Sequence, residues 1–358
     1  DQPDHPGDDT GFGFRSERAT DGDRVVLDAR AHLRPAAAVV ITAGVQHERE
    51  TEDVQSETES DFGTGPFVET SVFDAARTTS AVYAQALADL ASGLALTLNG
   101  RADHNSAFGT LGTLRAGAAY RFAAGTRIRG SIGTAYKAPT FCELFCSQPF
   151  IVGNSALEPE HVTTWELGAE QPIAGGLVVL GATWFDQSFD ERIEYVAAEP
   201  EEPNYFNLTA ARARGLELAA SASPAPGLGL TAAYTWLDTE TTDDGGDPAF
   251  AEGSRLLRRP EHTVSASARY ATGRAALSAG VVHVGQRDDI GFDGAGRVKL
   301  PGYTTVNAAL TVDLLRNGAD RALAATFRAE NLFDEQYEQT TGFPGRGRMI
   351  YAGVRAGL

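Results

Sequence analysis

The feature of this sequence that most constrains its fold is an alternation of apolar and polar residues with a period of two, which recurs along nearly the whole chain. In residues 302–314, Val306 and Leu310 fall on one face, and Asn307 and Asp313 fall on the other. Successive side chains of a β-strand point to opposite faces, so this pattern indicates a strand with one apolar side. The same pattern returns in residues 24–34, 94–101, 113–122 and 262–270.

The pattern and the turn residues between its repeats predict about 16 strands. They are expected near residues 10–20, 22–34, 37–50, 76–90, 93–104, 109–122, 125–137, 161–171, 176–196, 204–222, 227–239, 259–270, 274–286, 302–314, 322–332 and 346–358. The connections alternate in length. Short turns contain glycine or proline, at residues 123–125, 174–176, 224–227 and 271–273. Long loops are expected at about 51–75, 138–160, 240–258, 287–301 and 333–345. Short turns at one end and long loops at the other are typical of outer-membrane β-barrels.

Soluble β-proteins also alternate, so a secreted β-sandwich, a solenoid and an adhesin are competing interpretations. A sandwich needs apolar inner faces on both sheets, whereas the polar face of nearly every strand here carries Arg, Asp, Glu or Thr. Aromatic residues also lie near strand ends, as the interfacial girdles of a membrane barrel require. They are Tyr120, Phe122, Trp184, Phe185, Tyr234, Trp236 and Tyr351. The sequence therefore predicts an all-β, antiparallel transmembrane β-barrel.

Composition and motifs exclude several classes of function. The formal net charge of -18 disfavours binding to nucleic acid, which needs clustered basic residues. Acidic segments at 48–61 and 243–247 are interpreted as solvated loops, because they lack the ligand spacing of a calcium loop; no metal site is predicted. The dipeptide His47-Glu48 is isolated, and no catalytic or nucleotide-binding motif is present. We therefore predict no enzymatic activity and no cofactor.

Several motifs resemble those of TonB-dependent outer-membrane receptors. Gly133-Thr-Ala-Tyr-Lys-Ala-Pro-Thr-Phe141 is followed by Gly153-Asn-Ser-Ala-Leu-Glu-Pro-Glu160 and by Trp165-Glu166. Further matches continue in the family's order. They are Ala211-Arg-Ala-Arg-Gly-Leu-Glu217, Leu256-Leu-Arg-Arg-Pro260, Glu330-Asn-Leu-Phe-Asp-Glu-Gln-Tyr337 and Pro344-Gly-Arg-Gly-Arg348. Within the family the sequence looks most like the cobalamin transporter, with siderophore receptors next.

The resemblance implies a fold and an architecture. Family members carry a TonB box, a globular plug and a 22-stranded barrel, so residues 1–358 are expected to be the C-terminal portion of the barrel domain. The plug and roughly six strands would then be absent from this chain, together with any export signal, since the sequence begins at Asp1 without Met or an apolar leader. The chain alone is expected not to couple to TonB.

The resemblance also implies a function. A protein of this kind resides in the bacterial outer membrane, contacts lipid and lipopolysaccharide, and imports cobalamin or a ferric siderophore with energy from the TonB-ExbB-ExbD complex. The barrel assembly machinery reads the last strand of such proteins, where Leu358 stands in place of the usual aromatic residue. Two other functions stay open: a passive diffusion porin, and a secreted soluble adhesin or lectin.

Candidate ligand contacts are aromatic and basic residues in loops and near a strand end. They are Phe141, Phe145, Phe150, Tyr205, Phe206 and Arg212. The alternative is that the aromatic residues pack the loops against one another. Cys142 and Cys146 could form a local disulfide or remain free thiols. Gly215 is interpreted as a β-bulge or as a close approach of the backbone. Alternation places Arg212 and Arg214 on the lipid side, so we expect them above the bilayer or beyond such a bulge.

Overall fold

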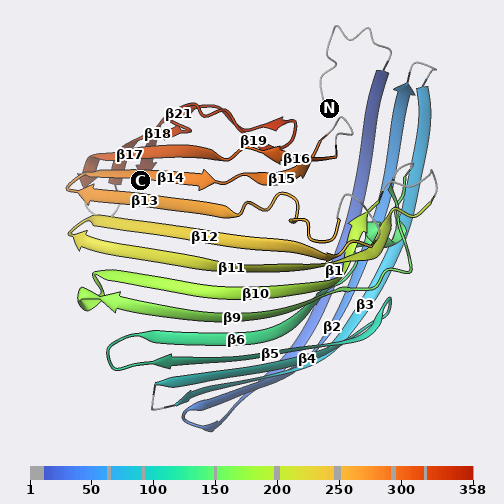
Figure 1. Cartoon of the computed structure of the whole chain (residues 1–358), viewed down its shortest axis with the longest axis horizontal. Helices are drawn as coiled ribbons and strands as arrows, with labels where there is room; N and C mark the ends of the chain where they lie inside the picture. Colours follow the sequence, from blue (N-terminus) through green and yellow to red (C-terminus); the bar gives the residue numbers. More distant parts are fainter. Residues whose placement is uncertain are drawn as a thin grey trace.

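The computed structural model describes residues 12–62, 66–90, 93–148, 151–196, 202–245, 251–291, 296–317 and 321–357. Fifteen strands form one antiparallel sheet in which neighbours in sequence are neighbours in space (Figure 1). These strands are β1 (Phe12–Ala36), β2 (Val39–Phe62), β3 (Pro66–Leu90), β4 (Leu94–Asn105), β5 (Gly109–Arg121), β6 (Arg127–Lys137), β9 (Glu160–Ile173), β10 (Val178–Tyr195), β11 (Tyr205–Ala225), β12 (Leu228–Asp243), β13 (His262–Thr272), β14 (Ala275–Val284), β17 (Tyr303–Asn317), β18 (Arg321–Glu330) and β21 (Met349–Gly357). The all-β antiparallel prediction is confirmed.

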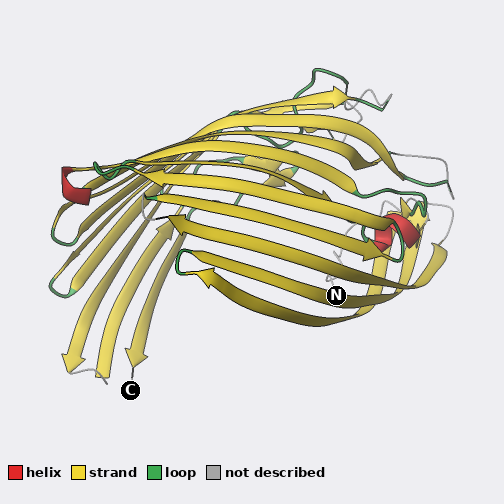
Figure 2. Cartoon of the chain, turned by 90° about the horizontal axis from the view of Figure 1, so that it is seen from below, coloured by secondary structure: helices red, strands yellow, loops and turns green. Residues whose placement is uncertain are grey.

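The sheet curves into a trough, and β1 and β21 are its two edges (Figures 1 and 2). In an antiparallel meander of 15 strands, the first and the last strand run in the same direction. β1 and β21 therefore cannot close the trough by pairing antiparallel with each other. An even number of strands is needed for such closure.

The N-terminal third departs from the prediction in two ways. Residues 10–20 and 22–34 do not form two strands, because Asp21, Gly22 and Asp23 pair with β2 inside the single strand β1. The predicted loop 51–75 was also wrong, because β2 continues to Phe62 and β3 begins at Pro66. Carboxylates suggested a solvated loop, but they lie on strands that pair along their whole length. Merging the first two predicted strands accounts for 15 strands in the sheet rather than 16.

The two faces of the sheet differ in chemistry. Large aliphatic side chains on the convex face are exposed, including Leu98 (58%), Leu114 (67%) and Leu167 (56%). On the same strands, Asn99 and Arg115 occupy alternate positions and face the concave side. Aliphatic groups left in water would be unfavourable over an area of this size, so the convex face is of the kind that contacts lipid. The apolar sides do not meet each other in a dry interior.

Aromatic residues border the apolar band on the convex face. The rings of Trp184 and Trp236 lie 5.9 Å apart, on the same face of β10 and β12, and Tyr120 meets Phe122 at the short-turn end. On β12 the band spans residues 228–236, close to the roughly 9–11 residues that a tilted strand needs to cross a bilayer. These positions fit the predicted interfacial girdles.

Tyr351 does not belong to the girdle, because it alternates with the exposed Ile350 and lies beside Arg328 on the concave face. Phe185 does not belong to the girdle either, because it alternates with Trp184 and lies on the concave face. Its ring covers Gly215, whose α-carbon pairs with it across β10 and β11. A Cβ at Gly215 would lie 2.7 Å from the Phe185 ring and would overlap the Trp236 carbonyl oxygen. Of the two interpretations of Gly215, the bulge is wrong, since the register is continuous there, and the close approach of neighbouring groups is confirmed.

The remaining short strands and the helix lie in the long loops at one end of the sheet. One long loop contains α1 (Phe141–Phe145), β7 (Ser147–Gln148) and β8 (Ile151–Val152). Two others form the hairpins β15 (Arg287–Ile290) with β16 (Arg297–Leu300), and β19 (Glu338–Thr340) with β20 (Phe343–Pro344). The opposite end has tight connections, one of which is the 3-10 turn η1 (Ala174–Gly176). No helix in the described ranges is long and apolar enough to span a membrane.

The long strands β1, β2 and β3 bring three carboxylates into one row. Asp21 pairs with Asp53, and Asp53 pairs with Asp74, so the three side chains stand side by side on the same face. All three are exposed. Like charges directly opposite each other destabilise an antiparallel pair, so this row weakens the pairing of the three strands.

Candidate functional site

The loop between β6 and β9 folds inward and packs on the concave face of β2 and β3. Phe141 and Cys146 form a buried cluster with Val54, Phe73 and Ala75. α1 begins with a capping box, in which the Thr140 hydroxyl accepts from the Glu143 amide and the Glu143 carboxylate accepts from the Thr140 amide. Figure 2 shows this short helix against the long strands. The cluster therefore fixes the loop to the sheet.

A disulfide and the contacts of Arg77 hold the same part of the loop. Cys142 and Cys146 are joined by a disulfide, with an S–S distance of 2.05 Å. Arg77 on β3 donates to the Pro139 carbonyl (2.7 Å), pairs with Glu50 (2.6 Å), and places its guanidinium 4.7 Å from the centre of the Phe141 ring. The described part of the chain has no free cysteine.

Three asparagines fasten the other side of this loop to β10 and β11. Asn204 is buried, accepts from the Val152 amide (2.8 Å) and donates to the Val196 carbonyl (3.0 Å). Asn154 donates to the Tyr205 carbonyl (2.9 Å). Asn207 both accepts from the Glu158 amide and donates to its carbonyl. The loop between β6 and β9 is thus attached to the sheet on both sides. We call this loop the strap, and we call the end of the trough that carries the long loops its mouth.

The predicted contact residues divide into three groups. Phe141 is only 6% exposed, so it serves mainly to anchor the strap, whereas Phe145 is 40% exposed and stacks 6.5 Å from it. Tyr205 and Phe206 are half-buried at the start of β11, where Tyr205 meets Tyr195 edge to face at 5.6 Å. Phe150 lies outside the described residues.

Arg212 lies away from this mouth. It shares the convex face with Leu216 and Leu218 and forms a two-point ion pair with buried Asp186 (3.0 and 2.5 Å). Its neighbour Arg214 pairs with Asp238 at 2.9 Å on the same face. Both arginines therefore stand beyond the tryptophan pair, as expected for residues above the bilayer, and Arg212 does not join the aromatic residues of the strap.

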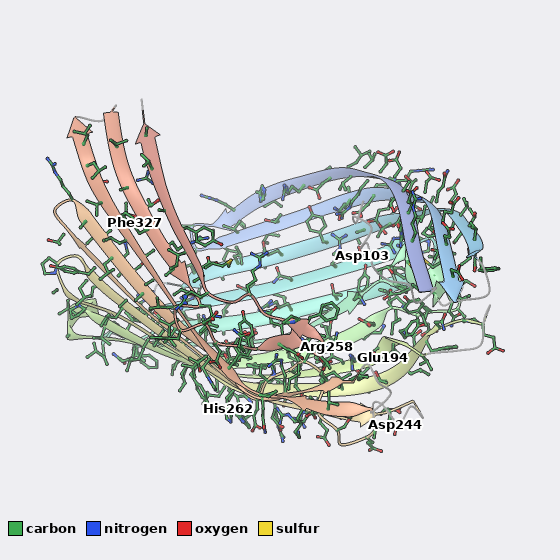
Figure 3. All side chains as sticks on the ribbon, turned by 90° about the horizontal axis from the view of Figure 1, so that it is seen from above. Asp103, Glu194, Asp244, Arg258, His262 and Phe327 are labelled. Atoms are coloured by element: carbon green, nitrogen blue, oxygen red, sulfur yellow. A yellow bond between two sulfur atoms is a disulfide. The ribbon has the colours of Figure 1, made fainter. Side chains whose placement is uncertain are left out.

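A charged pocket on the concave face, close to the strap, was not identified from the sequence. It has a volume of about 380 Å³ and brings together pairs from β1 to β4. Arg24 pairs with Glu48 (2.8 Å), and Arg101 pairs with Asp103 (2.6 Å). Asp103 is 2% exposed and is labelled in Figure 3. The signal was present in the alternation, because charged residues recur on the polar face of these strands.

A second anchored region joins three loops at the other side of the mouth. Asp289 has no exposed surface and accepts from Arg258 Nε (2.7 Å), the Ile290 amide (2.9 Å) and the Thr341 amide (2.8 Å) and hydroxyl (3.0 Å). Burial acts to raise the pKa of Asp289, but these hydrogen bonds outweigh it and lower the pKa to about 2. Arg287 donates to the Glu338 and Gln339 carbonyls.

The rim between the two regions holds a partly buried carboxylate. Burial raises the pKa of Glu194, and the ion pair with Arg192 (2.7 Å) and the Thr209 hydroxyl oppose that shift. Within the described residues, no group of three His, Cys, Asp or Glu side chains is arranged to hold a metal ion. The mouth offers aromatic rings, ion pairs and hydrogen-bonding groups, which are groups that can contact a ligand.

Comparisons with known proteins agree with this architecture. The family described as TonB dependent receptor-like, beta-barrel matches residues 3–332. The vitamin B12 transporter BtuB of Photobacterium profundum is 26% identical over 259 residues, which cover 70% of this chain and 39% of that protein. BtuB of Vibrio cholerae serotype O1 is 25% identical over 257 residues, covering 71% of this chain and 38% of that protein. The chain thus spans about two-fifths of the length of these relatives.

Solved structures share the fold. The siderophore receptor PiuA from Acinetobacter baumannii has a TM-score of 0.73 at 15% identity, covering 97% of this chain and 57% of that one. The ferric citrate transporter FecA in the unliganded form has a TM-score of 0.72 at 14% identity, covering 97% and 56%. The copper transporter OprC has a TM-score of 0.72 at 15% identity, covering 95% and 58%.

Proposed function

Since this chain belongs to the TonB-dependent receptor family, whose barrels reside in the outer membrane, we propose that it forms the major part of the barrel wall of an outer-membrane receptor for a scarce nutrient. The nutrient is bound at the mouth of the trough and imported with energy from the TonB-ExbB-ExbD complex. Cobalamin and ferric siderophores are the substrates to test first, because the relatives include vitamin B12 transporters and a siderophore receptor.

The observation that carries this proposal is the division of the sheet into an apolar convex face and a polar concave face. The long loops, which contain the helix and the short strands, lie at one end of this sheet. A wall of this kind can separate lipid from an aqueous lumen. The strap narrows the mouth on one side, and its exposed Phe145 offers an apolar contact to a corrinoid or a chelate. A receptor needs such a site, whereas a passive pore needs only an open passage.

Binding and uptake assays test the proposal. Cells that produce the protein as it is naturally encoded are given radiolabelled cyanocobalamin and, separately, a ferric siderophore. We expect saturable binding with at least one of the two, and uptake that stops when TonB is deleted or the proton gradient is collapsed. Conductance of small ions in planar bilayers without saturable binding of either compound would contradict the proposal and favour a porin.

A matched pair of variants tests the role of the strap. Replacing Phe145 by alanine removes the exposed ring and is expected to weaken ligand binding about tenfold, or ~1.4 kcal/mol. Phe333 is more exposed, at 73%, and lies in a turn after β18, so Phe333→Ala serves as the control and should bind as tightly as the unmodified protein. Equal binding by Phe145→Ala and the control would remove Phe145 from the site.

A further inference from the structure

Three arginines gather on the concave face between β4 and β10, towards the short-turn end of the sheet and away from the strap. Arg115, Arg127 and Arg129 line a pocket of about 480 Å³. Thr97, Ser131 and Glu166 line it as well, and its other lining residues are alanines and glycines, so every long side chain around it is charged. All three arginines are exposed to the trough.

Glycines make room for these guanidinium groups. A Cβ at Gly168 would lie 3.0 Å from both Arg129 Nε and the Thr183 hydroxyl, so Arg129 rests across a position that has no side chain. A Cβ at Gly133 would lie 3.1 Å from the Arg115 side chain. The backbone therefore forms the floor of the pocket, and the arginines lie along it.

The arginines are held by neutral groups rather than by carboxylates. Arg115 donates to the Ser131 hydroxyl (3.3 Å), and Arg129 donates to the Thr183 hydroxyl (3.2 Å). In the ranges that the structure describes, Arg115, Arg127 and Arg129 form no ion pair, unlike Arg24 and Arg101 on the same face. A guanidinium carries five N–H donors, so most of their donors stay available.

Charges of both signs surround the pocket. Arg121 pairs with Arg127 across the β5–β6 turn and adds a fourth cation. Four carboxylates stand in the same rows: Glu166 lines the pocket, Glu170 pairs with Arg127, Glu217 pairs with Thr183, and Asp89 pairs with Ala95. Among the described residues none of these carboxylates forms an ion pair with the three arginines of the pocket, so the guanidinium groups are not neutralised by direct contact.

We infer that this arginine pocket binds an anionic group, either a carboxylate or a phosphate, of the substrate that passes along the concave face. Planar guanidinium forks match both groups, and arginines lining a passage select for anions. The inference rests on the proposed function and deepens it, because it assigns the substrate a negative charge.

Calorimetry on the purified protein in detergent, at low ionic strength, tests the inference with two probes, pyrophosphate and citrate. We expect at least one probe to bind in the unmodified protein, and the double variant Arg115→Gln/Arg129→Gln to bind it at least tenfold more weakly. The control is Arg328→Gln, which removes a cation that already pairs with Glu330 at 3.0 Å and should change affinity less than twofold. Arg115→Lys/Arg129→Lys keeps the charge and should retain most of the binding.

Two results would overturn the inference: no binding of either probe to the unmodified protein, or equal binding by the Arg→Gln double variant. If carboxylates of another polypeptide segment occupied the arginines, neither probe would bind and the double variant would lower the unfolding temperature. Circular dichroism of each variant shows that loss of binding is not loss of fold. Probe binding without energised uptake would contradict the proposed function alone, and uptake without probe binding would contradict this inference alone.

Discussion

Replacing Asp289 by asparagine tests how the loops on one side of the mouth are held together. The carboxylate accepts four hydrogen bonds, two on each oxygen. An amide keeps one acceptor oxygen and turns the other into a donor, and it also loses the negative charge that faces Arg258. At least one buried N–H is then left without an acceptor.

The cost follows from these contacts. A buried donor without a partner costs about 1–3 kcal/mol, so we expect the local free energy of opening to fall by about 2 kcal/mol. A loss of about 2 kcal/mol corresponds to a roughly thirtyfold increase in the population of the open state. Hydrogen exchange of the Ile290 and Thr341 amides, which donate to Asp289, measures this change directly.

The control and the pH dependence sharpen this test. Asp288→Asn alters adjacent ion pairs with Lys299 and Arg297 but removes no hydrogen bond to the Ile290 or Thr341 amide, so exchange should rise less than fivefold. Because the pKa of Asp289 is lowered from 3.8 to about 2, its stabilising effect is full above pH about 4 and is lost as the pH falls through about 2. Unchanged exchange in Asp289→Asn would refute the argument that this carboxylate joins the loops.

Two further predictions concern the sheet. Gly215→Ala should lower the free energy of unfolding in urea by more than about 2 kcal/mol, because the new methyl group would overlap the Trp236 carbonyl oxygen. Gly229→Ala is the control, since a Cβ there meets nothing within 4 Å, and it should lower that free energy by about 0.5 kcal/mol or less. Similar losses in the two variants would contradict the packing described at Gly215. Asp53→Asn should stabilise the protein by roughly 0.2–1 kcal/mol, because it removes the repulsion of Asp53 by Asp21 and Asp74, and the gain should be smaller at high salt. Asp23 faces a threonine, so Asp23→Asn is the control and should give no such gain. Equal effects of the two changes would show that repulsion within the row does not destabilise the sheet.

Most of the sheet was predictable because its signal is local. Alternation fixes which residues of β4, β5, β13 and β17 face each way, and glycine or proline marks the short turns. The errors arose where charge was taken as a sign of a loop. Asp21-Gly22-Asp23 has the composition of a turn, yet each residue pairs with β2, because exposed strands tolerate carboxylates that stay in water.

The site was less predictable, because it depends on contacts between distant segments. Phe141 was expected to contact ligand, but it is buried against Val54 and Phe73, which lie in a region that had been assigned to a loop. Alternation predicts the face of the sheet on which Arg212 lies. It does not predict that Arg212 pairs with Asp186, because the register between β10 and β11 has no signal in the local sequence. The arginine pocket likewise depends on the register of β5, β6 and β9.

The central claim is that the convex face meets lipid and the concave face meets water, and the accessibility of spin labels at neighbouring positions tests it most directly. Single cysteines at Leu98, Leu114 and Leu167, and at their neighbours Asn99 and Arg115, are spin-labelled in the protein reconstituted in lipid vesicles. We expect labels at the leucines to collide with oxygen, which dissolves in lipid, and labels at the other two positions to collide with a water-soluble nickel chelate. Equal access of the nickel chelate to both sets of positions would contradict the claim.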